Sequence, residues 1–273
     1  MLSIIVSSYQ PEYFNQFSSN VKDTIGEDFL YEIIQIWNPG LMGICEAYNK
    51  GAEQSIHDNL LFIHEDVEFK TFEWGEKLLN YLNNLEIGVV GLAGSDYVPN
   101  CPSTWHIDKK FMHNNILQFD KENNLIVENT SENKEVYSLD GVFLGVKKNI
   151  YNQFKFNSKL KDFHGYDIDF TIRVSSTFKN LVISDIKLLH FSKGSFSKDL
   201  VEARILARSS YKIPLGQKIN QAVEKKALLM FIIDLRRINF TKSKIIEEVL
   251  PYLSVKHLGV KSSIKFLINI FLG

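Results

Sequence analysis

The stretch Leu2-Ser-Ile-Ile-Val-Ser-Ser8 is short, rich in β-branched residues and apolar on both of its alternating faces. Such a run is typical of a strand that is buried on both faces of a parallel sheet. Three similar runs follow along the chain, at 31–37, 59–63 and 87–92. These four runs predict the core strands of one sheet.

The segments between these runs have the spacing of amphipathic helices. Their apolar residues form two helical stripes, which are Cys45, Tyr48, Ala52 and Ile56, and Trp74, Leu78, Tyr81 and Leu82. Alternation of strand and helix predicts βαβ units. The expected fold class is α/β, with a mixed, mostly parallel sheet flanked by helices.

After residue 94 the sequence becomes a polar loop that contains Trp105. The next stretch predicts a hairpin, with strands at 116–119 and 125–128 around a turn at 120–124. Three further elements are expected before the sheet ends, which are a strand at 136–146, a helix at 163–178 and a strand at 181–190.

From about residue 199 onward the pattern is helical, with basic residues among aliphatic ones. We therefore expect a first domain at 1–198, with halves at 1–94 and 95–198, and a C-terminal helical region at 199–273. Three roles are open for this region: packing on the first domain, formation of a homodimer, and peripheral contact with a membrane through its Lys- and Arg-flanked faces. Packing is the role that the sequence favours.

The composition excludes several classes of protein. Of 273 residues, 45% are hydrophobic and 23% are charged, which suits an ordinary folded protein. A formal net charge of -1 provides no field for binding nucleic acid. Two cysteines, Cys45 and Cys101, are too few for a disulfide framework. Without a basic leader or a window of roughly 20 apolar residues, a cytoplasmic protein is expected, free or peripheral on the inner face of a membrane.

Polar residues follow several predicted strands, at the edge where open α/β sheets bind ligands. The first strand ends in Ser7, Ser8 and Tyr9, which offer hydroxyl groups and an aromatic face. A helix N-cap before Pro11 explains the serines equally simply, because Ser is a preferred capping residue. On capping preference alone, the N-cap is the favoured explanation.

The third run ends in His64-Glu-Asp66, which places metal-competent side chains after a buried strand. Carboxylates in such a place repel one another unless a cation neutralises them, and Mg²⁺ or Mn²⁺ on a diphosphate would do so. A solvated acidic loop is the alternative. His190, at the end of the last expected strand, adds an imidazole that Mn²⁺ accepts, although a lone histidine is more often structural.

The last motif begins a helix at Gly165 and carries Asp167 in its first turn. A plain helix cap is one explanation, because the helix dipole stabilises an acid there. Asp167 and Asp169 lie two residues apart and point in different directions. Since Asp169 and Arg173 have the i, i+4 spacing of an ion pair, Asp167 is left for a functional site.

In this order, the motifs of residues 1–195 resemble the GT-A fold glycosyltransferases of the family 2 type. Val6-Ser-Ser-Tyr9 is similar to the nucleotide segment of the first strand, and Phe62-Ile-His-Glu-Asp66 to the metal-binding acidic motif. Ala47-Tyr-Asn-Lys-Gly51 is similar to the helix that packs beside the donor. The resemblance implies a GT-A, Rossmann-like domain.

The rest of the resemblance lies in the second half. Gly165-Tyr-Asp-Ile-Asp169 is similar to the acidic helix start, in which the aspartate matching Asp167 is the general base. His190 matches the histidine that completes the metal site. Leu139-Asp-Gly-Val-Phe-Leu-Gly145 resembles the strand that lines the sugar and acceptor pocket.

The resemblance implies a role for each half. The half at 1–94 would bind the nucleotide-sugar donor, through Ser7, Ser8, Tyr9, Trp37, Asn49, Glu65 and Asp66. The half at 95–198 would bind sugar and acceptor, through Trp105, Asp140, Gly141, His164 and Tyr166. Asp66 and His190, with His64 as a further candidate, would hold Mn²⁺ or Mg²⁺. The implied activity is inverting transfer from a nucleotide diphosphate sugar, with UDP-sugar favoured, to a hydroxyl of a glycan, lipid-linked glycan or glycoprotein.

Two departures from the family pattern stand out. His64 occupies a position where the family usually has Asp, which makes Asp66 the direct carboxylate ligand. The second strand ends in Trp37-Asn-Pro-Gly40 instead of acidic residues, so Trp37 or Tyr9 would stack on the nucleobase.

Two rival functions remain open. One is a nucleotide-sugar or glycan binding subunit without turnover, against which only Asp167 argues directly. The other is a metal-dependent nucleotidyltransferase, which should carry a Gly-rich, basic triphosphate loop near the first strand. Residues 7–11 have neither feature.

Overall fold

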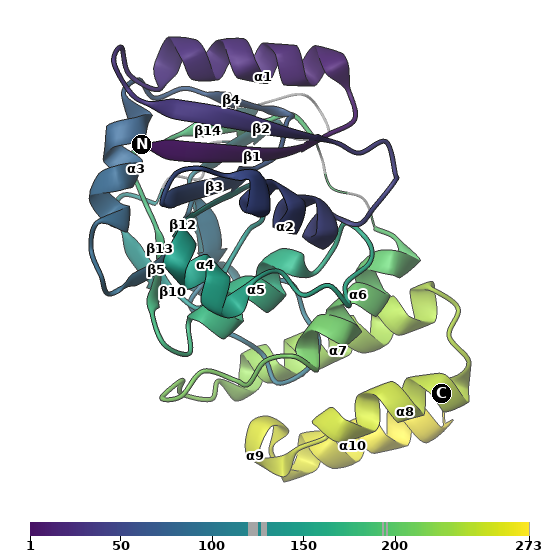
Figure 1. The fold of residues 1–273 in the computed structure, drawn as a ribbon. Helices are drawn as coiled ribbons and strands as arrows, with labels where there is room; N and C mark the ends of the chain where they lie inside the picture. The colour runs from purple at the N-terminus through teal and green to yellow at the C-terminus, as the bar shows by residue number, and fades with distance from the viewer. Residues whose placement is uncertain (120–124, 127–129, 193, 195, 273) are drawn as a thin grey trace.

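The fold is described from a computed structural model of the chain. The structure describes residues 1–273 except 120–124, 127–129, 193, 195 and 273. A central sheet with helices on both faces occupies the N-terminal two thirds, and the C-terminal helices form a layer of their own (Figure 1).

The central sheet has seven strands in the order β10-β13-β5-β12-β3-β1-β2. Their bounds are β1 Leu2–Ser8, β2 Tyr31–Trp37, β3 Asn59–Ile63, β5 Ile87–Gly91, β10 Lys134–Val136, β12 Phe143–Lys147 and β13 Lys179–Val182. β1 pairs in parallel with β2 and β3, and β13 pairs in parallel with β5. β12 lies antiparallel between β3 and β5, and β10 is antiparallel at the edge. The sheet is therefore mixed, with five of its strands in one direction.

Five helices flank this sheet, which are α1 Pro11–Thr24, α2 Ile44–Gln54, α3 Trp74–Leu82, α4 Lys148–Phe154 and α5 Tyr166–Val174. Gly51 of α2 packs on Ile5, which pairs with Phe62, whereas Leu78 of α3 packs on Gly145, which pairs with Leu61. Successive residues of a strand point to opposite faces. Helices α2 and α3 therefore cover opposite faces of the sheet.

Two small sheets extend the domain beyond the central one. The first contains β4 Val67–Phe69, β14 Leu188–His190, β8 Ile116–Phe119 and β9 Leu125–Ile126, and the second contains β11 Ser138–Leu139, β6 Ala93–Ser95 and β7 Met112–Asn114. β14 pairs antiparallel with β4 and parallel with β8. This pairing brings residue 190 beside residue 67, although the two are far apart in the chain.

The C-terminal region is helical, as predicted. Its elements are α6 Lys198–Arg208, α7 Gln221–Arg237, α8 Lys242–Val249, α9 Val255–Leu258 and α10 Val260–Leu272, with a 3₁₀ turn at Leu250–Tyr252. Side chains of Ser197, Asn220 and Thr241 accept backbone N–H groups at the starts of α6, α7 and α8. Within the described residues, no helix combines the length and the apolar character needed to cross a bilayer.

Buried apolar side chains gather in two clusters within the described part of the chain. One fills the space between the central sheet and its helices. The other contains side chains from each of the helices α6, α7, α8, α9 and α10. It also includes Tyr97, Cys101 and Ile107 from the loop after β6. On its outer side α10 exposes Val260, Ile264 and Ile268. The predicted dimer or membrane contact through these helices stays a prediction.

Several expected elements are shorter than the sequence pattern suggested. The strand expected at 136–146 is divided among β10, β11 and β12, because Asp140 accepts the N–H of Val142 and closes a turn. The strand expected at 181–190 is divided between β13 and β14, which belong to different sheets. Ile56, expected on a helical stripe, lies beyond α2 and is 75% exposed.

Two other expectations concern a helix and a hairpin. The helix expected at 163–178 is limited to α5, because Gly165 precedes it with a φ of 74°, in the left-handed region. β8 and β9 pair antiparallel, as the expected hairpin requires. Its turn at 120–124 and the end of its second strand at 127–128 lie outside the described residues.

Candidate active site

Three side chains that could hold a metal ion meet where β3 and β14 end and β4 begins. His64 and Asp66 lie in the short connection between β3 and β4, and His190 ends β14. The backbone N–H of Phe191 donates to the Asp66 carbonyl oxygen at 3.0 Å, which continues the β4–β14 pairing and fixes His190 beside Asp66. Each of the three residues offers one ligand atom, and these atoms lie within 4.8 Å of one another.

Asp66 lies between the two imidazoles of this cluster. Its Oδ2 is 3.4 Å from Nε2 of His190, and its Oδ1 is 3.8 Å from Nδ1 of His64. Burial alone would raise the pKa of Asp66, but the hydrogen bond and charge of His190, together with His64, lower the pKa to about 2. Asp66 is therefore an anion at physiological pH.

His190 is oriented by neighbours on both ring nitrogens. Its Nδ1 lies 3.0 Å from Nε2 of Gln118, and its Nε2 lies 3.0 Å from Oγ of Ser192. Gln118 is on β8, which pairs with β14. The sequence reading missed Gln118 and Ser192, because their positions depend on the pairing of strands far apart in the chain.

His64 connects the metal-competent cluster to the start of α5. Its Nε2 is 2.8 Å from the hydroxyl of Tyr166, the first residue of that helix. Burial lowers the pKa of His64, and the nearby His190 lowers it further. A Cβ atom at Gly141 would lie 2.1 Å from the Tyr166 hydroxyl oxygen, so only glycine leaves room for the ring there. His64, Tyr166 and Gly141 therefore lie together.

Asp167, the next residue of α5, is partly buried and lies near the carboxylate of Asp140. Burial raises the pKa of Asp167, and the neighbouring carboxylate of Asp140 raises it as well. Backbone N–H groups, including that of Gly141, oppose this shift in part, and the resulting pKa is about 7. Asp167 thus exchanges a proton near neutral pH, unlike Asp66.

Asp140 is held next to Asp167 by two hydrogen bonds. Its Oδ2 accepts the indole N–H of Trp105 at 2.9 Å, and its Oδ1 accepts the N–H of Val142 at 2.9 Å. Trp105 is only 6% exposed and belongs to the main core. Its ring thus anchors the loop after β6, and the expected stacking on a sugar has no support from its burial.

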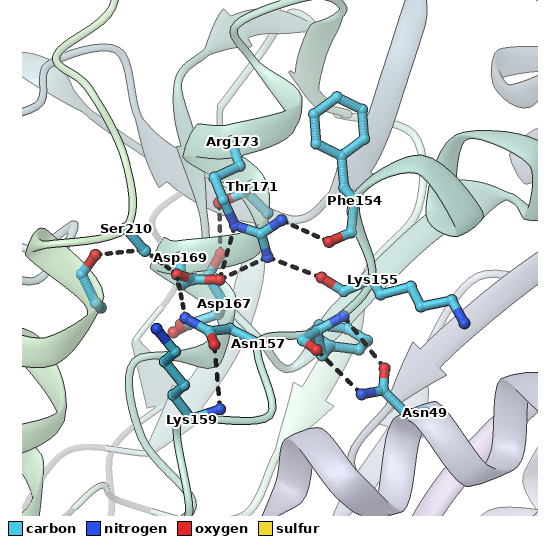
Figure 2. Close-up of polar contacts among 12 residues, drawn as sticks. Asn49, Phe154, Lys155, Asn157, Lys159, Asp167, Asp169, Thr171, Arg173 and Ser210 are labelled. Atoms are coloured by element: carbon cyan, nitrogen blue, oxygen red, sulfur yellow. Dashed lines mark hydrogen bonds and ion pairs between the residues drawn. The ribbon is translucent and has the colours of Figure 1, made fainter.

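Asp169 forms the structural ion pair that the sequence predicted (Figure 2). Its Oδ2 accepts from Nε and NH2 of Arg173 at 3.0 and 2.6 Å. Its Oδ1 accepts from Asn157 and from Ser210. Asp169 is fully buried and fully partnered, so its role is to hold α5 in place.

The segment after β1 is hydrogen-bonded to Glu65 of the acidic motif. Oε1 of Glu65 accepts the backbone N–H groups of Tyr9 and Gln10 at 3.0 and 3.1 Å. Its other carboxylate oxygen is buried and has no partner within the described residues. The N-cap alternative for the serines is wrong, because α1 is preceded by Gln10, whose side chain makes no capping bond.

The other donor-side residues differ in how far their side chains are already used. Ser7 and Ser8 accept hydrogen bonds from Asn38 and Gln35, respectively. Two exposed aromatic rings stand at the ends of β1 and β2, with Tyr9 56% and Trp37 48% exposed. These rings are available to a nucleobase.

Asn49 and His164 lie apart from the metal-competent cluster. The carboxamide of Asn49 is used by the chain itself, because it bonds to the backbone between Lys155 and Asn157 (Figure 2), at Phe156. It also accepts the hydroxyl of Tyr151. Asn49 lines a cavity of about 300 Å³ between α2 and residues 158–161. Burial lowers the pKa of His164, and no contact between His164 and a ligand-competent residue of the cluster is found in the described structure.

Comparisons with known proteins identify the family and the fold of this chain. A family model described as "Glycosyltransferase like family" matches residues 3–198. A comparison with curated protein sequences gives no match.

Three solved structures, of two proteins, show the same fold at low sequence identity. GalNAc-T7 with UDP, GalNAc and Mn²⁺ is 10% identical with a TM-score of 0.54, over 94% of this chain and 58% of that one. S. aureus TarS 1-349 in complex with UDP is 13% identical with a TM-score of 0.52, over 90% of this chain and 74% of that one. A longer TarS chain, of which this chain spans 44%, has a TM-score of 0.50 at 14% identity. The fold is that of GT-A glycosyltransferases, and the chain belongs to the glycosyltransferase-like family.

Proposed function

We propose that this chain transfers a sugar from a UDP-sugar to a hydroxyl group of a glycan or glycoconjugate, with inversion at the anomeric carbon. The observation that carries the proposal is the contrast between two neighbouring carboxylates. Asp66 is held as an anion between two imidazoles, whereas Asp167 has a pKa of about 7. A cation site for a diphosphate beside a base for a hydroxyl is what this reaction requires.

His64, Asp66 and His190 fit a divalent cation. Their ligand atoms are close together, and burial favours the neutral imidazole of His64 that a metal needs. A cation bound there would neutralise the negative charge that develops on the diphosphate leaving group. Two imidazoles with one carboxylate favour Mn²⁺ or another transition metal over Mg²⁺, which prefers oxygen ligands.

Tyr166 determines which nitrogen of His64 faces this site. When the Tyr166 hydroxyl accepts the proton of Nε2, Nδ1 presents its lone pair on the Asp66 side. An outer hydrogen bond of this type fixes both the ring orientation and the tautomer of a metal-binding histidine. His64 can thus replace the aspartate that is usual at this position of the family.

Asp167 is the proposed general base. It takes the proton from the acceptor hydroxyl while that oxygen attacks the anomeric carbon on the face opposite to the diphosphate. A base is most efficient when its pKa lies near the working pH, as the value of about 7 does. Tyr9 and Trp37, exposed at the ends of β1 and β2, are the proposed platform for the nucleobase.

A donor screen tests the proposal. UDP-, GDP- and dTDP-sugars are added with and without Mn²⁺, and the melting temperature and sugar release are measured. We expect UDP-sugars to stabilise the chain only with Mn²⁺, since a ligand at 100 times its Kd adds ~2.7 kcal/mol to the free energy of unfolding. Stabilisation without hydrolysis or transfer would instead favour a binding subunit, and no stabilisation by any donor would contradict the proposal.

A further inference from the structure

The loop at 96–108, between β6 and the 3₁₀ turn Lys109–Phe111, is anchored in both halves of the molecule. Tyr97, Cys101 and Ile107 are buried in the core of the C-terminal helices. Trp105 is buried in the core of the sheet domain. The loop therefore links the C-terminal helices to the region of Asp140 and Asp167.

Glu224 of α7 provides the strongest attachment of this loop. Its Oε1 accepts the Tyr97 hydroxyl at 2.8 Å, and its Oε2 accepts the backbone N–H of Asn100 at 3.0 Å. Glu224 is only 2% exposed. A buried carboxylate is costly unless it is fully hydrogen-bonded, and here both of its oxygens are bonded to the loop.

Two further residues of the C-terminal region bind the backbone of the same loop. The carboxamide of Gln217 accepts from Val98 N at 2.7 Å and donates to Val98 O at 2.9 Å, as a neighbouring strand would. Arg208 of α6 donates through Nε to the Asn100 carbonyl oxygen at 2.7 Å. Backbone groups of the loop are thus satisfied by side chains of 208–224, and the loop cannot keep this shape without them.

The other end of the loop reaches the proposed base through two contacts. Trp105 donates its indole N–H to Asp140, and the charge of Asp140 acts on Asp167. A change in the loop is therefore expected to move Trp105 and Asp140, which lie on the acceptor side. The donor-side cluster of Asp66 and His190 is built on β4 and β14.

We propose that Glu224 is a positioning residue for the acceptor side of the transfer reaction, acting through the 96–108 loop on Trp105 and Asp140. This inference rests on the proposed function and extends it, because it assigns the C-terminal helices a part in the reaction. Glu224 touches neither substrate. It acts by holding the loop that sets the geometry around the base.

Kinetics of Glu224→Ala provide the first test. Misplacement of reacting groups by about 1 Å can cost ~100-fold in rate. We expect kcat to fall or the acceptor KM to rise by at least ~10-fold, with the Mn²⁺-dependent affinity for UDP unchanged. Glu224→Gln should recover most of the activity, because its oxygen can accept the Asn100 N–H and its NH2 group can donate to the Tyr97 hydroxyl oxygen. Glu247→Ala, on the exposed face of α8, is the matched control and should behave like the wild type.

Hydrogen exchange by mass spectrometry tests the linkage without any substrate. In Glu224→Ala, amide exchange should accelerate in peptides of 96–108 and also of 138–143, which contain Asp140. Unchanged exchange at 138–143, or equal losses of donor affinity and acceptor turnover, would overturn the inference. Failure of the wild type to bind UDP with Mn²⁺ would count against the proposed function, and the exchange result would still decide the linkage.

Discussion

The surroundings of Asp66 and of Asp167 differ although the two sites are neighbours. Around Asp66, two imidazoles outweigh the effect of burial and lower the pKa to about 2. Around Asp167, burial and the Asp140 carboxylate act in the same direction and raise the pKa to about 7. His64 and Tyr166, in contact at 2.8 Å, lie between the two sites.

The difference shows how surroundings give the same type of side chain two different protonation behaviours. A permanent carboxylate anion is a metal ligand, and a carboxylate that exchanges its proton near neutral pH is a base. Environments that push the pKa values of two titratable groups apart are a mark of assigned acid and base roles.

The largest effect is expected from Asp167→Asn. Loss of the base should lower turnover by ~10² to 10⁴ and leave the affinity for UDP with Mn²⁺ nearly unchanged. Steady-state kinetics with the best donor of the screen would measure this. Asp162→Asn, an exposed neighbour of α5, should keep wild-type turnover.

The pH dependence gives a second measure of the same variant. Only deprotonated Asp167 accepts a proton, so wild-type turnover should rise with pH through about 7 and change by about tenfold per unit below it. Residual turnover of Asp167→Asn should lack this step. Wild-type rates in the variant, or an unchanged profile, would show that another group is the base.

Asp169, two residues from Asp167, has a structural role in an ion pair with Arg173. Asp169→Ala leaves Arg173 without its buried partner and should lower the free energy of unfolding by ~3–5 kcal/mol. Asp167→Ala should raise that free energy at pH 8. Because the pKa of Asp167 rises from 3.8 to about 7 on folding, the group destabilises the fold increasingly as the pH rises through that window, and the loss is complete above about 7.

Urea denaturation of Asp169→Ala and Asp167→Ala at pH 5 and pH 8 would measure both changes in the free energy of unfolding. The stabilisation by Asp167→Ala should shrink at pH 5, where Asp167 of the folded wild type is protonated. Equal destabilisation by both variants at pH 8 would mean that Asp167 is a structural acid like Asp169.

A smaller effect is expected from Tyr166→Phe. Without the hydroxyl that fixes the tautomer of His64, the affinity for Mn²⁺ should fall by ~10- to 100-fold. Electron paramagnetic resonance of free and bound Mn²⁺ would measure it. Tyr151→Phe removes another hydroxyl, hydrogen-bonded to Asn49, and should bind Mn²⁺ like the wild type. Equal affinities in all three proteins would remove Tyr166 from the metal site.

Much of the fold could be predicted from the period of its apolar residues. β1, β2 and β3 lie where the runs at 2–8, 31–37 and 59–63 predicted them. The run at 136–146 was misread as one strand, because the turn at Asp140 is closed by a side chain and leaves the apolar pattern almost unbroken. Periodicity reports burial, and it does not report where a strand passes from one sheet to the next.

The candidate site could be predicted in part. The Asp169–Arg173 pair follows from helical spacing, and the structure confirms it. The contact between His64 and Tyr166 joins residues 102 positions apart and leaves no local signal. Glu224 does have a local signal in the sequence, because an acid on the apolar stripe of a helix indicates a buried partner. Residue spacing does not show that this partner is the 96–108 loop.

The most direct test asks whether Asp66 binds the metal and Asp167 does not. UDP is titrated calorimetrically into Asp66→Asn and into Asp167→Asn, each with and without Mn²⁺. We expect the Mn²⁺-dependent gain in affinity to disappear in Asp66→Asn and to persist in Asp167→Asn. Loss of that gain in Asp167→Asn, or its survival in Asp66→Asn, would show that the two carboxylates do not have these separate roles.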